Sequence, residues 1–197
     1  MIDEGLPAVN VCALDSVREE LFTYAGSGTL FTRESYTVVR DLALHEFDAA
    51  HHLMGRGVSE GFLLERSAEQ KEHVLAHTFG VFVEDRYLAG IGALLPHAGS
   101  SPMGEVVSLY TVTRFVGEGV GTHLLRFAAD RARQTGLETV FACTASTTVE
   151  KCFVRNGYSV VEPGALPASK WRGYPESRRA QLTCLALDVS GVAGGGL

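Results

Sequence analysis

The chain has 197 residues, 46% of them hydrophobic and 20% charged, a composition typical of a single globular domain with its own core. A formal net charge of −6 without a basic tract argues against nucleic acid as the main partner. Its apolar runs are too short to cross a bilayer, and its acidic start, MIDEGLPAVN, lacks the order of a signal peptide. We therefore expect a cytoplasmic protein without a membrane partner.

Helix and strand patterns alternate through the first half of the chain. Ser67 followed by Gln70 forms a capping box that begins a helix. The apolar runs on either side of Asp85 and Arg86 predict a β-hairpin with a tight turn. The predicted elements are a helix over 15–24, a strand over 36–44, a helix over 46–54 ending before two glycines, a helix over 67–77, strands over 79–84 and 87–95, and a loop over 97–103.

The stretch 104–121, GEVVSLYTVTRFVGEGVG, combines a buried strand, a glycine-rich turn and the start of a helix. The first N–H groups of such a helix have no internal partners and can bind an anion such as a pyrophosphate. Glycines allow that anion to approach the backbone closely. A plain strand-to-helix turn would show the same glycines, and their spacing does not match the G-x-G-x-x-G dinucleotide fingerprint.

The second half continues the alternation. The predicted elements are a strand over 139–144, a helix over 147–156 closed by Gly157, and strands over 158–161 and 182–189, with a proline-bounded, arginine-rich segment between them. Helices that alternate with strands after a leading hairpin predict an α/β (α+β) fold, in which a mixed central sheet is covered by helices on both faces.

This order of elements resembles the GNAT N-acetyltransferase superfamily. The family's acetyl-CoA signature, [Q/R]-x-x-G-x-[G/A], is matched within VGEGVG at 116–121, although valine stands where Gln or Arg is usual. The resemblance implies a GNAT fold and acetyl-CoA as co-substrate, held largely by backbone N–H groups. Arg114 either reaches a CoA phosphate or is a solvated surface charge. The expected acetyl-CoA-binding residues are Leu109, Thr111, Val116, Gly117, Glu118, Gly119, Val120, Gly121 and Thr122.

A narrower resemblance lies near the C-terminus. LPASKWRGYPESRRA at 166–180 is similar to the L-P-x-x-[K/R]-x-x-x-Y-x-x-x-R-x-S-K ending of N-acetylglutamate synthases, and GFLLERSAEQ, GEVV and REELFTYAGSGTLF are similar to other segments of these enzymes. The similarity implies a leader over 1–32 like the end of an amino-acid kinase domain, a GNAT domain over 33–190 and a flexible tail over 191–197. Without a segment similar to the kinase domain itself, we expect either a stand-alone short form or an excised domain.

The resemblance also implies catalytic roles. Amine acetylation needs a base for the ammonium group, a donor for the developing oxyanion and a proton for the leaving thiolate. Glu105 is the expected base, with a pKa raised by its position beside a buried strand. Backbone N–H groups around Leu109 would donate to the oxyanion if the strand carries a bulge there. Ser146, or Thr144 as the alternative, would protonate the thiolate, and Ser146 would also serve as the N-cap of the following helix.

Substrate carboxylates are well matched by guanidinium groups, which bind them with two parallel hydrogen bonds. Arg66 and Arg178 match the family's substrate arginines, and Lys170, Tyr174 and Arg179 are further candidates. The family's Ser-Lys pair after the arginines is Ala180-Gln181 in this chain, which removes a hydroxyl that contacts the substrate in the synthases.

Neither the histidines nor the cysteines predict a metal site. His45, His51, His52, His73 and His77 occur at helical spacings without an H-E-x-x-H pattern or a cysteine partner. Four cysteines occur without a C-x-x-C pair, so neither zinc nor a disulfide framework is expected. They are Cys12, Cys143, Cys152 and Cys184.

Three functions remain open at this point. The first is an acetyl-CoA-dependent amino-acid N-acetyltransferase that acts on L-glutamate in arginine biosynthesis, by direct transfer in a ternary complex. The second is a GNAT acetyltransferase for a different amine acceptor, motivated by Ala180 and Gln181. The third is a non-catalytic acetyl-CoA-binding module, motivated by Val116. Because an exposed edge strand needs covering, we also expect a homodimer.

Overall fold

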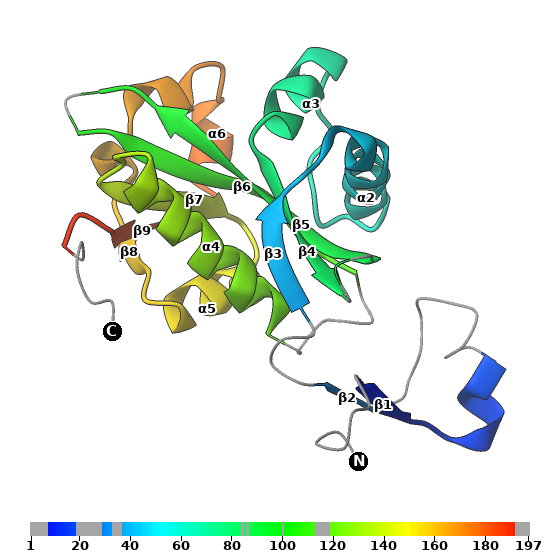
Figure 1. Ribbon diagram of the computed structural model, residues 1–197. Helices are drawn as coiled ribbons and strands as arrows, with labels where there is room; N and C mark the ends of the chain where they lie inside the picture. The colour runs from blue at the N-terminus through cyan, green and yellow to red at the C-terminus, as the bar shows by residue number, and fades with distance from the viewer. Residues whose placement is uncertain are drawn as a thin grey trace.

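The computed structural model describes residues 8–18, 29–32, 37–83, 85, 87–99, 101–112 and 119–191. Most of them form a seven-stranded mixed sheet flanked by helices, which confirms the predicted fold class (Figure 1). The strands of this sheet are β3 (Thr37–Asp41), β4 (Thr78–Val83), β5 (Tyr87–His97), β6 (Met103–Thr111), β7 (Thr139–Thr144), β8 (Ser159–Val161) and β9 (Thr183–Asp188). The α-helices are α2 (Phe47–Ser59), α3 (Ala68–Leu75), α4 (Val120–Gln134), α5 (Thr147–Arg155) and α6 (Glu176–Arg179).

The sheet has the order β3-β4-β5-β6-β7-β9-β8. Every neighbouring pair is antiparallel except β6 and β7, which are parallel and joined by the crossover helix α4. The parallel pairing covers only Met103–Glu105 of β6, opposite Thr139–Phe141 of β7. Beyond Glu105, the remainder of β6 is paired with β5 alone among the described strands.

The two faces of the sheet carry different helices. Phe79 of β4 is the strand partner of Gly92, and its ring lies 5.0 Å from the ring of Phe127 on α4. Tyr110 of β6 is the partner of Ile91, the residue before Gly92, so its side chain points to the opposite face. A side chain at Gly57 of α2 would meet the Tyr110 ring. Helix α2 therefore packs against this second face of the sheet.

A β-bulge interrupts β6 next to the end of the parallel pairing. Ala93 pairs with Val107 and Ile91 pairs with Tyr110, so two residues of β6 lie opposite Gly92. Ser108, one of the two, has a φ of 52°, in the left-handed region. Because of this additional residue, Glu105 and Tyr110 share one face of the sheet, although they are five residues apart.

Several element boundaries differ from the prediction. Helix α2 continues through both glycines to Ser59 because burial of its inner face outweighs the low helix propensity of glycine. Strand β5 continues through Pro96 to His97, and β6 already begins at Met103, so the predicted loop over 97–103 is shorter than expected. The capping box of α3 is confirmed: the Ser67 hydroxyl accepts from the Gln70 N–H, and the Gln70 side chain accepts from the Ser67 N–H.

The N-terminal part contains strands that the sequence did not predict. β1 (Ala8–Val11) and β2 (Thr29–Thr32) form a separate antiparallel sheet. Of the helix predicted over 15–24, the described part begins as the turn η2 (Leu14–Ser16), and residues 19–24 lie outside the described residues. The division of the chain at residue 32 stays a prediction. Over the described ranges, none of the helices combines the length and the apolarity needed to span a membrane.

Candidate active site

The centre of the candidate site is the carboxylate of Glu105, which is 5% exposed on β6. Its Oε2 atom lies 3.2 Å from Nε2 of His97, at the end of β5. Its Oε1 atom accepts a hydrogen bond from Nζ of Lys170, in the 3-10 turn η7 (Ala168–Trp171). One histidine and one lysine from distant parts of the chain therefore hold both oxygens of the predicted base.

These partners set the charge of Glu105. Burial raises the pKa of its carboxyl group, but the hydrogen bond from His97 and the positive charge of Lys170 outweigh burial, so the pKa is lowered overall. The expectation of a raised pKa is therefore wrong, because the sequence does not reveal the two partners. Burial lowers the pKa of Lys170, but the Glu105 charge more than offsets it, so the net shift is upward and the pair is ionised at neutral pH.

Lys170 and Tyr174 lie together beside Glu105. Besides its contact with Glu105, the Lys170 ammonium donates to the Tyr174 hydroxyl over 3.4 Å and lies 4.9 Å from the centre of the Tyr174 ring. Lys170 was predicted as a substrate-binding residue, and in this structure its partners are the carboxylate and the hydroxyl. Arg178 also contacts this tyrosine, with its Cζ 5.4 Å from the centre of the Tyr174 ring.

Arg66 reaches the site from the segment before α3. Its Nη1 donates to Oγ of Ser108 over 2.9 Å, and the guanidinium interacts electrostatically with Glu105 and Tyr174. Burial lowers the pKa of Arg66, while these two groups act in the opposite direction. The structure thus brings Arg66, Lys170 and Tyr174 together around Glu105, as the site prediction requires.

The two arginines of α6 differ in their surroundings. Arg178 is exposed and lies on the Tyr174 side of the helix. Arg179 is half-buried, and its Cζ lies 4.6 Å from the centre of the Trp171 ring. Stacking of this kind is typical of a guanidinium group that packs against its own fold. Arg178 is therefore the arginine of the pair that remains available at the site.

The bulge in β6 occurs at the position where an oxyanion donor was expected. Leu109 follows Ser108, and the backbone there no longer runs beside β7. A bulge leaves a residue without its regular ladder hydrogen bonds, so its N–H can point to a ligand. The bulge itself is confirmed, and its role in catalysis stays a prediction.

Ser146 occupies the N-cap position of α5. Its Oγ accepts a hydrogen bond from the Val149 N–H over 3.4 Å, and its own N–H donates to Oγ1 of Thr144 over 3.0 Å. The capping role is confirmed. The exposed Ser146 hydroxyl uses only an acceptor position in this bond, so its proton stays available for donation.

The glycine turn is described only in part. Arg114, Val116, Gly117 and Glu118 lie outside the described residues, so their predicted roles stay predictions. Gly119 precedes α4 with a φ of 79°, a conformation that favours glycine.

The first turn of α4 uses its side chains for packing. Val120 is 2% exposed, so the chain could contact a ligand there only through its backbone. The Thr122 hydroxyl accepts from the Asn156 amide over 3.3 Å, which ties α4 to the end of α5. A Cβ added at Gly121 would lie 3.5 Å from the Cys152 sulfur, its nearest neighbour. The Thr111 hydroxyl lies next to Gly90 of the adjacent strand β5.

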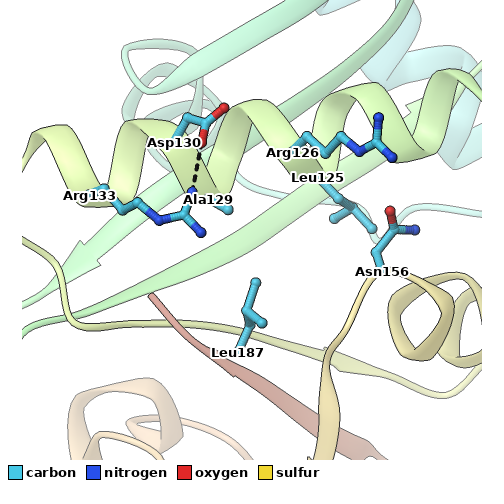
Figure 2. A pocket seen from close by; sticks show the side chains of 7 residues that line it. All are labelled: Leu125, Arg126, Ala129, Asp130, Arg133, Asn156 and Leu187. Carbon is cyan, nitrogen blue, oxygen red and sulfur yellow. Dashed lines mark hydrogen bonds and ion pairs between the residues drawn. The ribbon is translucent and has the colours of Figure 1, made fainter. Parts of the chain in front are cut away.

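A separate cavity of about 360 Å³ lies between α4, the end of α5 and β9. Figure 2 shows its seven lining residues, among which Arg133 donates to Asp130 over 2.6 Å. The lining residues are Leu125, Arg126, Ala129, Asp130, Arg133, Asn156 and Leu187. None of the predicted site residues lines it, and α4 covers the face of the sheet opposite Glu105. The cavity is therefore distinct from the site around Glu105.

Two residues of the site were missed by the sequence reasoning. His97 was assigned to a loop, and Ser108 was read only as part of a buried strand. A histidine at the end of an apolar strand gives no signal unless the register of β5 against β6 is known. His73 and His77, which lie at a helical spacing, form an edge-to-face contact with a ring distance of 5.3 Å. Within the described ranges, no group of three or more His, Cys, Asp or Glu residues is placed to hold a metal ion.

The comparison with known families decides the identity of this fold. Residues 38–158 match the acetyltransferase (GNAT) family. The chain belongs to the GNAT family of acetyltransferases. The family match thus confirms the resemblance seen in the sequence.

Amino-acid acetyltransferases are similar to this GNAT chain over most of its length. The enzyme from Pseudomonas putida is 31% identical over 168 residues, which are 85% of this chain and 38% of that protein. The enzyme from Vibrio cholerae is 28% identical over 169 residues, which are 86% of this chain and 37% of that protein. The GNAT chain therefore spans less than two fifths of the length of these relatives.

A solved structure is also similar to this GNAT chain over most of its length. The N-acetylglutamate synthase from Neisseria gonorrhoeae, in complex with coenzyme A and N-acetyl-glutamate, superposes with a TM-score of 0.68 at 25% identity. The match covers 88% of this chain and 40% of that chain. This GNAT chain is thus homologous to the acetyltransferase part of longer enzymes.

Proposed function

We propose that this GNAT chain transfers the acetyl group of acetyl-CoA directly to the α-amine of an amino acid, with L-glutamate as the first acceptor and arginine biosynthesis as the pathway. The observation that supports this most is the buried carboxylate of Glu105 next to two cationic side chains, Lys170 and Arg66, at the point where β6 leaves β7. The similarity to amino-acid acetyltransferases supports the same reaction.

Glu105 would act on the ammonium group of the acceptor. A free α-amine is mostly protonated at neutral pH and must lose a proton before it attacks the thioester. The lowered pKa makes Glu105 a weaker base than the sequence suggested, but it keeps the carboxylate charged. A charged carboxylate attracts the ammonium group and accepts its proton directly or through a water molecule.

Cationic side chains would recognise the carboxylates of the acceptor. Arg66 uses only Nη1 in its bond to Ser108, which leaves further N–H groups of the guanidinium for a carboxylate. Arg178 is exposed beside Tyr174 and would supply a second guanidinium. An acceptor with two carboxylates matches two such groups better than an acceptor with one.

Acetyl-CoA would lie along the part of β6 that follows its pairing with β7. The residues that fit it are the backbone at Leu109 and Thr111 and the N-terminus of α4 from Gly119 to Thr122, where the first N–H groups of the helix have no internal partners. The bulge at Ser108 and Leu109 would direct an N–H toward the thioester oxygen, and Ser146 would donate a proton to the departing thiolate.

The test is release of coenzyme A from acetyl-CoA with a panel of free amino acids. We expect saturable turnover with L-glutamate, and a loss of about 100-fold or more in kcat for Glu105→Gln at unchanged acetyl-CoA affinity. The matched control is Glu162→Gln, which removes the charge of an exposed glutamate and should leave kcat unchanged. Full activity of Glu105→Gln would refute the assigned role.

A second candidate is a GNAT acetyltransferase with another carboxylate-bearing amine as acceptor. Ala180, at the end of α6, has no hydroxyl where the synthases carry a serine that contacts the substrate. Acetyl-CoA binding together with turnover of another amine, but not of glutamate, would favour this function. Turnover of no amine at all would favour a non-catalytic acetyl-CoA-binding module.

The assembly and the compartment of the protein are further expectations. The strand β8 ends the sheet, and Val160 on it is 60% exposed. An exposed edge strand with an apolar side chain is usually covered by another chain, which favours a homodimer. Light scattering of the purified chain tests the dimer, and cell fractionation tests the cytoplasmic location.

A further inference from the structure

Tyr110 is a buried polar side chain of β6 that no step of the proposed reaction uses. It is 4% exposed and lies on the Glu105 face of the strand, against α2. Its hydroxyl donates a hydrogen bond of 2.7 Å to Oε2 of Glu60, the C-cap residue of α2. Burial and this bond raise the pKa of Tyr110 to about 12, so the hydroxyl keeps its proton and remains a donor at neutral pH.

Glu60 joins the strand β6 to the end of α2. Its Oε1 accepts from Nε of Arg56, one helical turn earlier, over 2.7 Å, so both oxygens of the carboxylate have partners. The bond from Arg56 and the bond from Tyr110 lower the pKa of Glu60. The acceptor of the Tyr110 bond is therefore a charged carboxylate, and such bonds are roughly twice as strong as neutral ones.

The chain leaves α2 in a direction that its sequence determines. Gly61, directly after the C-cap, has a φ of 79°, and its N–H donates to the Val58 carbonyl. The next N–H, that of Phe62, donates to the Gly57 carbonyl. These two bonds form a Schellman motif, in which a glycine in the left-handed region ends the helix. The end of α2 is thus fixed, and the chain continues from it to Arg66.

The segment from Glu60 to Arg66, called the acceptor segment below, is bound to β6 at both of its ends. Glu60 accepts from Tyr110 over 2.7 Å, and Arg66 donates to Ser108 over 2.9 Å. Ser108 and Tyr110 are the two sequence neighbours of Leu109, where the backbone donor for the oxyanion is proposed. The two bonds together hold the Arg66 guanidinium in a set position relative to the backbone at Leu109.

We propose that Glu60 and Tyr110 are positioning residues for the acceptor amino acid and that they act through Arg66. The inference rests on the proposed acetyl transfer, in which Arg66 binds a carboxylate of the acceptor and the backbone at Leu109 binds the thioester oxygen. Without the bond at Glu60, Arg66 keeps its charge but loses part of its fixed position. Transfer depends on that position, because the amine must lie close to the thioester and in line with it.

The first experiment measures hydrogen exchange in the acceptor segment of the protein without substrates. Tyr110→Phe removes the hydroxyl and keeps the ring that packs at Gly57. We expect the amides that donate to the Gly57 carbonyl to exchange about 3-fold faster or more in this variant. The matched control is Tyr158→Phe, since the buried Tyr158 hydroxyl has no hydrogen-bond partner in the part of the chain that the structure describes. Exchange that is unchanged in Tyr110→Phe would overturn the proposal.

The second experiment is steady-state kinetics with both substrates. Tyr110→Phe and Glu60→Ala should each raise KM for the acceptor about 5-fold or more, with KM for acetyl-CoA nearly unchanged. Glu60→Gln should give a smaller rise, because its amide can still form a hydrogen bond with the Tyr110 hydroxyl. A merely structural role would lower the melting temperature without this difference between the substrates. Equal changes in both KM values, or an unchanged KM for the acceptor, would overturn the positioning role.

A double-mutant cycle tests whether the effect passes through Arg66. In the Arg66→Ala background, the guanidinium that the bond positions is absent, so Tyr110→Phe should change KM for the acceptor by less than about 2-fold. An effect of Tyr110→Phe as large in this background as in the wild type would show that Tyr110 acts independently of Arg66 and would overturn the proposal.

These experiments separate the inference from the proposed function. A wild-type protein that acetylates no amine refutes the proposed function, and the positioning role falls with it. Wild-type turnover together with an unchanged acceptor KM in Tyr110→Phe refutes the positioning role alone. Hydrogen exchange does not require turnover, so it shows in either case whether the bond between Tyr110 and Glu60 holds the acceptor segment.

Discussion

Arg66 donates a hydrogen bond to Ser108 over 2.9 Å and thereby connects the segment before α3 to the bulge of β6. The bond joins residues 42 positions apart and fixes the guanidinium beside Glu105. It also satisfies the hydroxyl of Ser108, which is 5% exposed. The geometry of the bulge and the position of the predicted substrate arginine are therefore linked.

Replacing Arg66 should weaken acceptor binding selectively. We expect Arg66→Ala to raise KM for the amino acid about 10-fold or more, since hydrogen bonds to charged groups contribute about 1.5–3 kcal/mol each. The KM for acetyl-CoA should change little, because Arg66 lies on the face of β6 that carries Glu105. Ser108→Ala retains the guanidinium charge and should give a smaller rise. Equal losses for both substrates would contradict the role of Arg66.

The neighbouring arginines of α6 allow a matched comparison. Arg178→Ala should raise KM for the acceptor by about 10-fold, because an exposed guanidinium beside Tyr174 is lost. Arg179→Ala should leave this KM unchanged and lower the melting temperature, because it removes the stacking on Trp171. Kinetics and thermal unfolding of both variants test the assignment. A larger KM effect for Arg179→Ala would reverse it.

The sequence predicted the sheet and the main helices because their signals are local. The capping box at Ser67, the hairpin around Asp85 and the glycine before α4 each depend on a few adjacent residues. The resemblance to N-acetylglutamate synthases then selected Arg66, Glu105 and Lys170, which the structure brings together.

The environment of Glu105 could not be predicted, because it depends on strand register. Leu95 and Glu105 are strand partners, so their side chains lie on one face of the sheet. His97 lies two residues after Leu95, on the same face, and therefore reaches Glu105. A shift of one residue would move His97 to the other face. A loop rich in Gly, Pro and Ser between β5 and β6 gives no information on this register. The lowered pKa of Glu105 was missed for the same reason.

The ion pair of Arg40 and Glu46 should control stability in acid. Two hydrogen bonds of 2.8 Å from Arg40 lower the pKa of Glu46 to about 2, against the opposing effect of burial, and the Ala43 N–H also donates to this carboxylate. A carboxyl group with a lowered pKa in the folded state stabilises the fold above its ordinary pKa of 4.5. This stabilisation is lost as the pH falls from 4.5 toward 2.

Urea unfolding at several pH values measures this effect. Between pH 4.5 and 2, the free energy of unfolding should fall more steeply for the wild type than for Glu46→Gln, which has no proton to take up at this position. In an Arg40→Gln background, the same substitution should make little difference to the slope. Parallel slopes for the wild type and Glu46→Gln would show that the ion pair does not contribute.

Two glycines of α2 should respond in opposite directions to alanine. Both lie inside the helix, where alanine is favoured over glycine by about 1 kcal/mol. A Cβ at Gly55 would meet nothing within 4 Å, so Gly55→Ala should raise the melting temperature. A Cβ at Gly57 would lie 2.8 Å from Cδ1 of Leu63 and 3.0 Å from the Tyr110 ring.

Overpacking at Gly57 should outweigh the gain in helix propensity. A clash with two side chains that themselves pack against the sheet costs about 1–3 kcal/mol, so Gly57→Ala should lower the melting temperature. Because Tyr110 lies on the Glu105 face of β6, this variant should also reduce acetyl transfer, while Gly55→Ala should not. Thermal unfolding of the pair measures the difference. A stabilised Gly57→Ala protein would show that α2 can move away from β6 without cost.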